Sequence, residues 1–454
     1  MTTDPFLRRS VKVKTKTLPA RFAPMRGWRY ASHEPLDRVL TPPYDVIDLD
    51  TWKEYYERHP HNIVRLILPT APTSTGTQDG YEQAARTQHA WQRGGILRQD
   101  EEATFYILRQ TFTDPAGRPT VRFGIVGRLL LRPWGEGIFP HEQTFPAAKA
   151  DRLALLEATG TQFSPIFTLF PDPTGNLRLQ LGTLAQTEPE RVYHDEEGVE
   201  HALWRISEPD VVAQLSHELS QRPLYVADGH HRYETALNYQ RRRRAQQPDA
   251  PPGQPFDYVM VYAAAMEDPG VTILPTHRAL RPAPTLTPER ILSQVVQSYD
   301  ITPIERDEDL LQWVHHLAPG LPDIALVFPH GPAYRLHLRL DRPHVQALQK
   351  RLPSAIFNLA VYQLQALILG PGAGVSDDPG EQKKRIHFSP NAAELLREVR
   401  AGHWGVVAFV APTSMEQLKA LADARLIAPP KATYFYPKLP SGLIMYRPGQ
   451  ERSS

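Results

Sequence analysis

The strongest chemical signal in the sequence is a short run between residues 225 and 237. An apolar stretch leads into Asp228-Gly229, and His230-His231-Arg232 follow at once. The pattern predicts a strand that turns directly into a helix, so that free backbone N–H groups, two imidazoles and a guanidinium meet at one point. Such a point suits an anion, above all a phosphate. The alternative is that Asp228 only caps the helix and the histidines lie at the surface.

A second group of reactive side chains follows Pro140. His141 and Glu142 stand in a stretch bounded by prolines, and Lys149 and Arg152 come shortly after. A zinc-protease helix needs a second histidine four positions after the first, which is missing here. The pattern predicts a loop that supplies a carboxylate base and cationic phosphate contacts. The alternative is a solvated loop with a surface ion pair.

Three further groups of arginine and lysine residues are candidates for binding phosphate or nucleic acid. Arg278 is predicted to lie in a loop just past an apolar strand, either as a phosphate ligand or as a solvated arginine. Lys431 and Lys438 flank an aromatic strand, for which a packed terminal strand with exposed lysines is the preferred interpretation. Residues 241–244 are four arginines at a predicted helix end, where a solvated end is favoured over a DNA contact.

The elements that must position these groups are those of a globular protein. The 454 residues exceed the ~250–300 at which one core stops growing, so we expect two or three packed units. There is no cysteine, which excludes disulfides, thiol catalysis and iron–sulfur clusters, and the net charge of +1 excludes a strongly basic nucleic-acid coat. The polar first residues and the lack of long apolar runs predict a cytoplasmic protein that does not enter a membrane.

Hydrophobic periodicity predicts a mixture of helices and strands. Residues 207–266 are expected to run helix, strand, helix, strand. Ile63–Leu68 is predicted as a strand, Ala355–Ile368 as one helix, and Thr433–Tyr436 with Leu443–Tyr446 as a final strand pair. The predicted fold class is α+β, that is, mixed α/β. The expected division is a flexible leader at 1–20, a mixed segment at 21–200, a core at 201–300 and a second mixed segment at 301–454.

The sequence from Ala227 to Leu237 resembles the signature of domain-of-unknown-function family 1015. The resemblance extends along most of the chain through five further motifs, at residues 42–47, 62–66, 140–144, 274–278 and 430–438. The Asp-Gly-His-His-Arg turn itself is similar to the phosphate-binding turn of the ParB/sulfiredoxin superfamily. That similarity implies a ParB/sulfiredoxin-like core around residues 201–300, with further mixed segments packed around it.

The resemblance implies a nucleotide ligand, because the superfamily includes CTP-binding partition proteins, sulfiredoxin and free-serine kinases. The predicted function is a nucleotide-dependent phosphotransferase that acts on a small hydroxyl compound, with free serine as the first candidate and ATP, ADP or CTP as donor or ligand. Gly229, His230, His231 and Arg232 would hold phosphate, helped by Asp228, Lys149, Arg152 and Arg278.

In this scheme Asp228 or Glu142 would hold Mg²⁺, and Glu142 would act as base with His141, Lys149 and Arg152 keeping it ionised. His141, His230 and His231 are the other predicted catalytic residues. Two alternatives remain: a nucleotide-binding switch related to partition proteins, and a scaffold without catalysis. No helix-turn-helix pattern was identified, and the sequence pI is about 8.0, so no specific nucleic-acid partner is expected.

Overall fold

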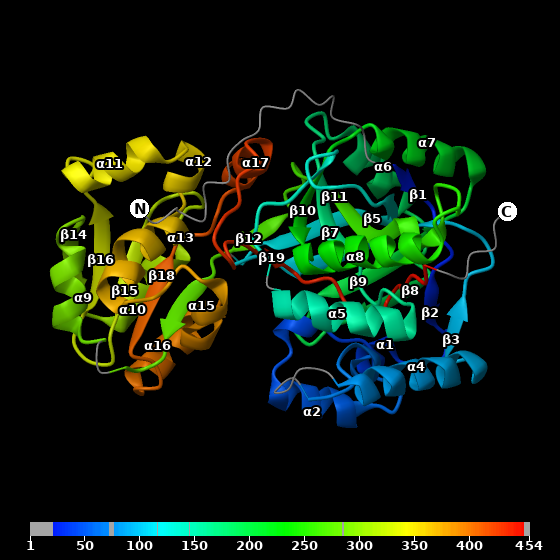
Figure 1. Cartoon of the computed structure of the whole chain (residues 1–454), viewed down its shortest axis with the longest axis horizontal. Helices are drawn as coiled ribbons and strands as arrows, with labels where there is room; N and C mark the ends of the chain where they lie inside the picture. The colour runs from blue at the N-terminus through cyan, green and yellow to red at the C-terminus, as the bar shows by residue number, and fades with distance from the viewer. Residues whose placement is uncertain (1–20, 72–76, 116, 145, 284–285, 449–454) are drawn as a thin grey trace. The chain divides into compact units, whose positions relative to one another are not determined.

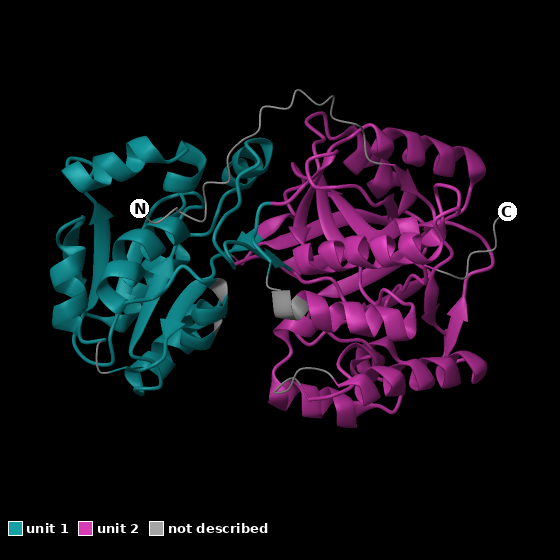
Figure 2. Ribbon diagram, in the orientation of Figure 1, with its two compact units in different colours: residues 1–14, 141–145, 273–436 teal, residues 15–140, 146–272, 437–454 magenta. Residues whose placement is uncertain are grey.

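The chain forms two compact units, each built from separate stretches of sequence (Figures 1 and 2). The computed structural model describes residues 21–71, 77–115, 117–144, 146–283 and 286–448. Unit 1 comprises residues 1–14, 141–145 and 273–436, and unit 2 comprises 15–140, 146–272 and 437–454. Both units contain helices and sheets, which confirms the predicted mixed α/β class.

Unit 2 is centred on a nine-stranded mixed sheet. Strands β6 and β10 are parallel, as are β7 and β11, whereas the other neighbours are antiparallel. The ninth strand, β1 (Phe22–Ala23), pairs with β5. The strand order is β6 (Ile138–Phe139), β10 (Leu224–Asp228), β7 (Ile166–Phe170), β11 (Tyr258–Ala265), β5 (Pro119–Leu130), β4 (Phe105–Thr113), β9 (Glu200–Ile206) and β8 (Arg191–His194).

The helices of unit 2 form layers beside this sheet (Figure 1). Helix α8 (His230–Gln246) packs against β7 and β11, and α5 (Pro146–Thr159) packs against α8 and against α4 (Gln78–Arg93). Strand β10 therefore leads directly into α8, a helix that packs on the sheet. The remaining elements of this unit are β2 (Trp28–Tyr30), β3 (Leu97–Gln99), α1 (Leu36–Val39), η1 (Tyr44–Val46), α2 (Leu49–Arg58), α3 (Val64–Ile67), α6 (Asn176–Leu184), α7 (Pro209–Ser220) and η2 (Pro255–Asp257).

Unit 1 is centred on a six-stranded antiparallel sheet that is covered on both faces. Along β18, Val406, Ala408 and Val410 belong to one apolar cluster, while Val407 and Phe409 belong to another, as the alternation of a strand with two buried faces requires. The order is β14 (Tyr299–Ile304), β16 (Ala333–Leu338), β15 (Ile324–Val327), β18 (Val406–Val410), β13 (His277–Leu280) and β17 (Ile386–Ser389).

Helices contribute the other half of each apolar cluster in unit 1. The first cluster draws on α9 (Pro288–Val295), α11 (Pro343–Arg351) and the helical stretch from residue 354 to 373, and the second on α10 (Asp307–His315) and α16 (Ala392–Arg400). The other elements are α15 (Pro379–Arg385), α17 (Met415–Asp423) and a separate two-stranded sheet of β12 (Thr272–Leu274) and β19 (Tyr434–Tyr436).

Three sequence-based predictions of elements are wrong. The predicted strand at 63–68 is the short helix α3, because the Asn62 side chain accepts from the Val64 backbone N–H at 2.9 Å and donates to the Arg38 carbonyl, which starts a helical turn. The predicted single helix at 355–368 is divided into α12 (Ser354–Phe357), α13 (Ala360–Gln363) and the π-helical turn η3 (Leu364–Leu369), which α14 (Gly370–Ala373) follows.

The third wrong prediction is the final strand pair. Strand β19 pairs with β12, whereas residues near 445 make only single bridges, Met445 with Trp28 and Tyr446 with Gln162. A periodicity of two identifies extended chain but not its partner, because pairing is decided by distant segments.

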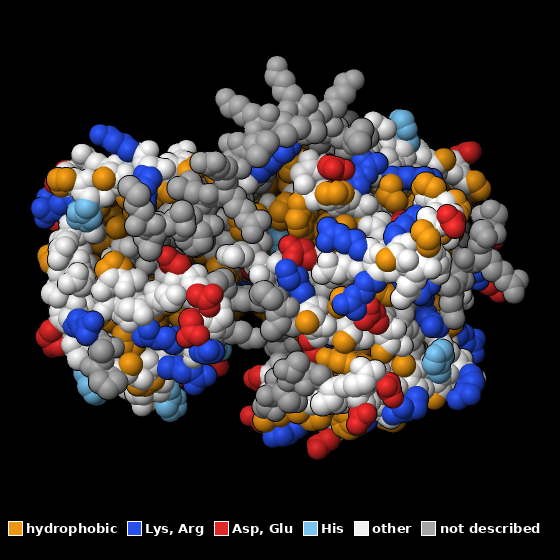
Figure 3. Space-filling view, in the orientation of Figure 1, with side chains coloured by type: hydrophobic (Ala, Val, Ile, Leu, Met, Phe, Trp, Pro, Cys, Tyr) orange, Lys and Arg blue, Asp and Glu red, His pale blue; other side chains and the backbone are white. Residues whose placement is uncertain are grey.

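Other predictions fall outside what the structure tests. The predicted leader at 1–20 lies outside the described residues. The division at 200 and 300 stays a prediction about segments of sequence, while the compact units are discontinuous along the chain. Within the described residues, no helix combines the length and apolar character needed to cross a bilayer. On the face in Figure 3, basic and acidic side chains are interspersed on each unit, consistent with the balanced composition.

Candidate functional site

The predicted strand-to-helix turn is present at the end of β10. The pairing of β10 with β7 shifts register between Val226 and Asp228, and Gly229 then adopts a φ of 98° as the N-cap of α8. A Cβ at Gly229 would meet the Arg232 guanidinium at 3.0 to 3.1 Å, so both the backbone angle and the space favour glycine. The N-cap residue of α8 is Gly229, which has no side chain that could cap the helix.

Arg232 is held in place from the first turn of α8. Its Nη1 donates to the Ser164 hydroxyl at 2.8 Å and to the Pro165 carbonyl at 2.7 Å, and its Nη2 lies 3.7 Å from a carboxylate oxygen of Asp228. The Lys438 ammonium lies 3.4 Å from the same oxygen. Two cations therefore flank one carboxylate, and we call Asp228 to Arg232 with Ser164 and Lys438 the α8 turn.

The two histidines of the α8 turn begin the helix. His230 is buried and His231 is half-buried. The structure brings all five predicted residues, Asp228 to Arg232, together as one local unit, because they are consecutive across the strand-to-helix junction. Fixed by its bonds to Ser164 and Pro165, the Arg232 side chain is a preorganised cation rather than a mobile one.

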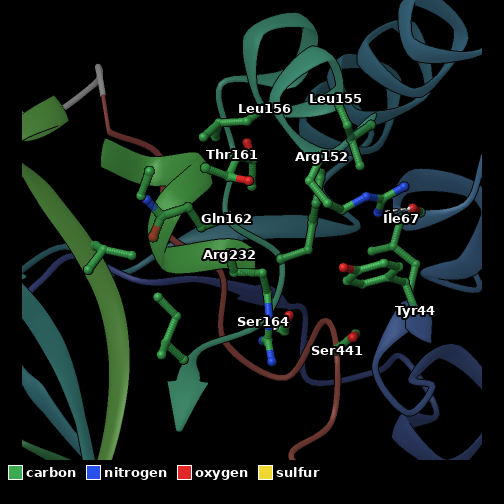
Figure 4. A pocket seen from close by; sticks show the side chains of 15 residues that line it. Tyr44, Ile67, Arg152, Leu155, Leu156, Thr161, Gln162, Ser164, Arg232 and Ser441 are labelled. Atoms are coloured by element: carbon green, nitrogen blue, oxygen red, sulfur yellow. Dashed lines mark hydrogen bonds between the residues drawn. The ribbon is translucent and has the colours of Figure 1, made fainter. Parts of the chain in front are cut away.

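A pocket in unit 2 begins at Arg232 (Figure 4). Its empty space, including the open mouth, is about 570 Å³. Figure 4 shows Arg232 and Ser164 on one side of the pocket and Tyr44 with Arg152 on another, and the Arg152 guanidinium lies 4.3 Å from the centre of the Tyr44 ring. The other lining residues are mostly apolar: Ile67, Leu155, Leu156, Thr161, Gln162, Phe163, Ile166, Thr235, Ala236, Val259 and Ser441.

Lys149 and Arg152, predicted to support Glu142, have acidic partners of their own in unit 2. The Lys149 ammonium lies 2.6 Å from a carboxylate oxygen of Glu234. Arg152 pairs with Asp151 at 2.5 Å and donates to the Ile67 carbonyl at 2.7 Å. Lys149 and Arg152 belong to unit 2 and Glu142 belongs to unit 1, so their support of Glu142 stays a prediction.

His141 and Glu142 are anchored in unit 1 by the segment near residue 430. A ring nitrogen of His141 lies 2.9 Å from the Thr433 hydroxyl, and Glu142 accepts from the Lys431 backbone N–H at 2.9 Å. Lys431 holds this position with a φ of 57°, in the left-handed region. His141 is fully buried, so the predicted solvated loop is wrong for this residue.

Arg278 lies in β13 and is buried, so both the predicted loop and the solvated alternative are wrong. It donates to the carbonyls of Thr276 and Lys431. Burial lowers the pKa of Arg278 to about 9, and the charge of Glu142 acts in the opposite direction. The guanidinium thus stays charged at neutral pH, and Glu142 is its electrostatic partner.

His277, the neighbour of Arg278, is a buried and neutral histidine. Its Nδ1 accepts from the Val410 backbone N–H at 3.2 Å, and its ring packs edge-on against Phe409. Burial lowers the pKa of His277 to about 3, and the charge of Arg278 adds to this shift. We call His141, Glu142, Thr276, His277, Arg278, Lys431 and Thr433 the Arg278 cluster.

The two predicted magnesium ligands, Asp228 and Glu142, each have cationic or hydrogen-bonding neighbours in the structure. Asp228 lies between two cations, and Glu142 accepts a backbone hydrogen bond near the buried Arg278. Mg²⁺ at nucleotide sites is usually held by one or two carboxylates together with phosphate oxygens and water, so magnesium binding stays a prediction. Neither residue belongs to the one group of three or more metal-ligating side chains found within the described residues.

Several pocket residues were not predicted as site residues. Tyr44, Ser164 and Ser441 line the pocket, whereas Lys438, predicted as an exposed lysine, lies beside Asp228. Two sequence patterns indicate part of this set: the Pro-Pro-Tyr turn at 42–44, because proline fixes the backbone, and the loop at 437–442, whose small residues permit close ligand approach. Ser164 meets Arg232 only through a tertiary contact.

Three solved structures align with about two thirds of this chain at low sequence identity. A conserved hypothetical protein from Pyrococcus furiosus is 12% identical and aligns over 67% of this chain and 90% of its own, with a TM-score of 0.30. A free serine kinase in complex with AMP is 10% identical and aligns over 66% of this chain and 84% of its own, with a TM-score of 0.30. SbnI from Staphylococcus aureus, with a C-terminal truncation, is 12% identical and aligns over 70% of this chain and 88% of its own, with a TM-score of 0.32.

No curated protein matches the chain. One family model, described as a protein of unknown function (DUF1015), matches residues 22–355, which is most of the chain. The chain therefore belongs to the DUF1015 family.

Proposed function

We propose that unit 2 binds a nucleotide with its phosphates at the α8 turn, and that the protein transfers a phosphoryl group to a small hydroxyl compound. The observation that carries the proposal is the position of Arg232, which lies in the first turn of α8 and also lines the pocket. A phosphate at this point would meet the helix N-terminus and a fixed guanidinium together.

The charges of the α8 turn suit an anion that enters from the pocket. Arg232 and Lys438 both lie beside the carboxylate of Asp228. A phosphate group carries more acceptor oxygens and more charge than one carboxylate, so it can compete for these cations. The exposed fractions of the Arg232 and Lys438 side chains are 16% and 15%, which leaves both accessible without unfolding.

The rest of the pocket suits a nucleoside. Ligand pockets are mostly apolar with a few fixed polar groups, and the lining of this pocket follows that pattern. Tyr44 offers an aromatic face, and Arg152 offers a second cation that already stacks on that ring. The resemblance of the turn to the ParB/sulfiredoxin superfamily also supports a nucleotide, with ATP, ADP and CTP as candidates and free serine as the first acceptor to test.

Nucleotide binding is tested by calorimetry with ATP, ADP and CTP. We expect Arg232→Ala to weaken binding by about 1.5–3 kcal/mol, because a charge-assisted contact is lost. Arg232→Lys should also be impaired, since an ammonium cannot replace both the fork and its bonds to Ser164. Arg242→Ala is the matched control: it removes the same charge from α8, where Arg242 pairs with Glu157 at an exposed site. Equal affinity in wild type and both Arg232 variants would remove the site.

Transfer is tested separately with nucleotide labelled in its terminal phosphate and a pool of amino acids and sugars. Glu142→Gln tests the prediction that Glu142 is the base, because the amide retains an oxygen that can accept from Lys431 N–H but cannot take a proton. We expect turnover to fall by ~10²–10⁴-fold while nucleotide still binds. Slow hydrolysis without an acceptor would instead indicate a nucleotide switch. Binding with no reaction, or no binding, would indicate a non-catalytic role.

A further inference from the structure

A histidine and glutamate cluster lies in unit 2, formed by residues outside the α8 turn. Glu34 follows β2, His59 is the residue after α2, and His61 comes two positions later. One carboxylate oxygen of Glu34 and one ring nitrogen of each histidine all lie within 4.8 Å of one another. This is the one group of three or more metal-ligating side chains found in the described part of the chain.

The spacing of these atoms is close to that of a metal's ligands. Zinc bonds to nitrogen and oxygen are ~2.0–2.2 Å long, so two ligands of a tetrahedral site lie roughly 3.4 Å apart. The Nδ1 of His61 lies 3.1 and 3.2 Å from the two Glu34 oxygens. The His59 and His61 rings are 5.3 Å apart and inclined at 69°, so neither blocks the other. Small side-chain adjustments would bring all three onto one ion.

The charge of Glu34 is the second observation that points to a cation. The carboxylate is only 5% exposed, and its side-chain partners among the described residues are the imidazoles of His61 and His33. No lysine or arginine of the described residues forms an ion pair with this buried carboxylate. A buried carboxylate without a countercharge is costly, and a divalent cation between Glu34 and the histidines would supply one.

The backbone around the cluster is already fixed. The Arg191 guanidinium donates to the Glu34 carbonyl at 3.0 Å, and the Tyr30 hydroxyl donates to the His61 carbonyl at 2.7 Å. The His61 backbone N–H donates to the His59 ring at 3.1 Å. These bonds hold the three side chains near one another without a metal, so binding would require little ordering of the chain.

We propose that Glu34, His59 and His61 bind a first-row divalent metal ion, with Zn²⁺ as the best match. Two imidazoles and one carboxylate form a common three-ligand zinc set, which leaves a fourth position for water. His33 lies 3.4 Å from Glu34 with a 62% exposed side chain, so it can rotate into that position instead. The site is not expected to bind hard cations such as Mg²⁺, because imidazole nitrogen is a poor ligand for them.

The ion would join two segments that are distant in sequence. It would tie the loop after β2 to the connection between α2 and α3, and α3 ends at Ile67, which lines the pocket. The metal is thus expected to stabilise one wall of that pocket and to take no part in phosphoryl transfer.

Zinc binding is tested on full-length protein from which any histidine tag and metal have been removed. Competition with a chromophoric chelator should give one Zn²⁺ per chain, and Co²⁺ should give the visible spectrum of a four-coordinate site. We expect His59→Ala and Glu34→Gln each to weaken binding by more than about 100-fold, since loss of a partner outside the ligand set alone costs roughly 10–100-fold. Zn²⁺ should also raise the melting temperature of wild type and not of these variants.

His217→Ala is the matched control, because it removes an exposed histidine from α7 in the same unit. It should bind Zn²⁺ as wild type does. His59 is only half-buried, so this variant is expected to fold even if Glu34→Gln does not. Absence of tight binding in wild type, or equal affinity in wild type and His59→Ala, would overturn the proposal and leave an ordinary hydrogen-bonded histidine and glutamate pair.

Discussion

The α8 turn of unit 2 and the Arg278 cluster of unit 1 both gather charged side chains, but water reaches them differently. In the α8 turn, the side chains of Asp228, Arg232 and Lys438 are 23%, 16% and 15% exposed, and a pocket opens beside them. In the Arg278 cluster, Arg278 is 4% exposed and His277 is fully buried. Charged side chains of similar types therefore lie in one site that solvent reaches and in another from which solvent is largely excluded.

This difference decides which property each cluster controls. A partly exposed ion pair contributes little to stability, because water solvates its members almost as well, and so its groups can exchange partners with a ligand. A buried charge has no such freedom and must be satisfied within the fold, as Arg278 is by two carbonyls and by Glu142. We therefore expect changes in the α8 turn to affect ligand binding and changes at the buried Arg278 and His277 to affect stability.

The largest expected effect is at Arg278. Arg278→Met should lower the free energy of unfolding of unit 1 by about 3–5 kcal/mol, because Glu142 and two carbonyls lose a buried partner. Hydrogen exchange of peptides from β13 and β18 would locate the loss. Arg290→Met, at an exposed position of α9, is the control and should change stability by less than about 0.5 kcal/mol. A small effect at Arg278 would place it with the exposed cations.

The next effect concerns pH and His277. The pKa of His277 is about 3 in the folded protein and ~6.5 when unfolded, so below pH 6.5 the unfolded state binds more protons. The stabilisation is complete above pH 6.5 and falls by about 1.4 kcal/mol per pH unit below it, or about 2 kcal/mol at pH 5. Urea unfolding at pH 7 and pH 5 should show this loss in wild type and less of it in His277→Gln. Identical pH profiles would mean that His277 is not buried as a neutral ring.

A smaller effect is expected at Gly229. Gly229→Ala should cost about 1–2 kcal/mol of stability, because an L-residue is strained at a φ of 98°. Its Cβ would also displace the Arg232 guanidinium, so nucleotide affinity should fall with it. Gly182→Ala in α6 is the control, since its Cβ would meet no atom within 4 Å. An affinity loss without any change in stability would show that the turn tolerates the angle.

The smallest effect is expected at Lys149. It pairs with Glu234, and the two side chains are 25% and 26% exposed, so Lys149→Gln should change stability by less than about 1 kcal/mol. Calorimetry should show nearly unchanged nucleotide affinity. A loss of nucleotide affinity above about 10-fold would instead show that Lys149 contacts phosphate. Its ion pair with Glu234 would then form only in the absence of ligand.

Local pattern was sufficient for many of the elements. Helix α7 and strands β10 and β11 lie in the predicted order within residues 207–266, because α7 begins at a proline and both strands are short, continuous apolar runs. The error at α3 arose in a short apolar run, for which periodicity alone does not separate strand from helix. The hydrogen bonds of Asn62 decided the outcome there.

By itself, the sequence determined the α8 turn, because its five residues are consecutive and a strand, a glycine and a helix start define their geometry locally. Only the tertiary structure decided the rest. Whether Arg278 is exposed depends on β18 and the segment at 431, and which acid pairs with Lys149 depends on where α8 lies beside α5. The approach of Glu34 to His59 and His61 likewise depends on packing across distant segments. Burial and ion pairing are set by neighbours far along the chain, and such neighbours leave no local pattern in a single sequence.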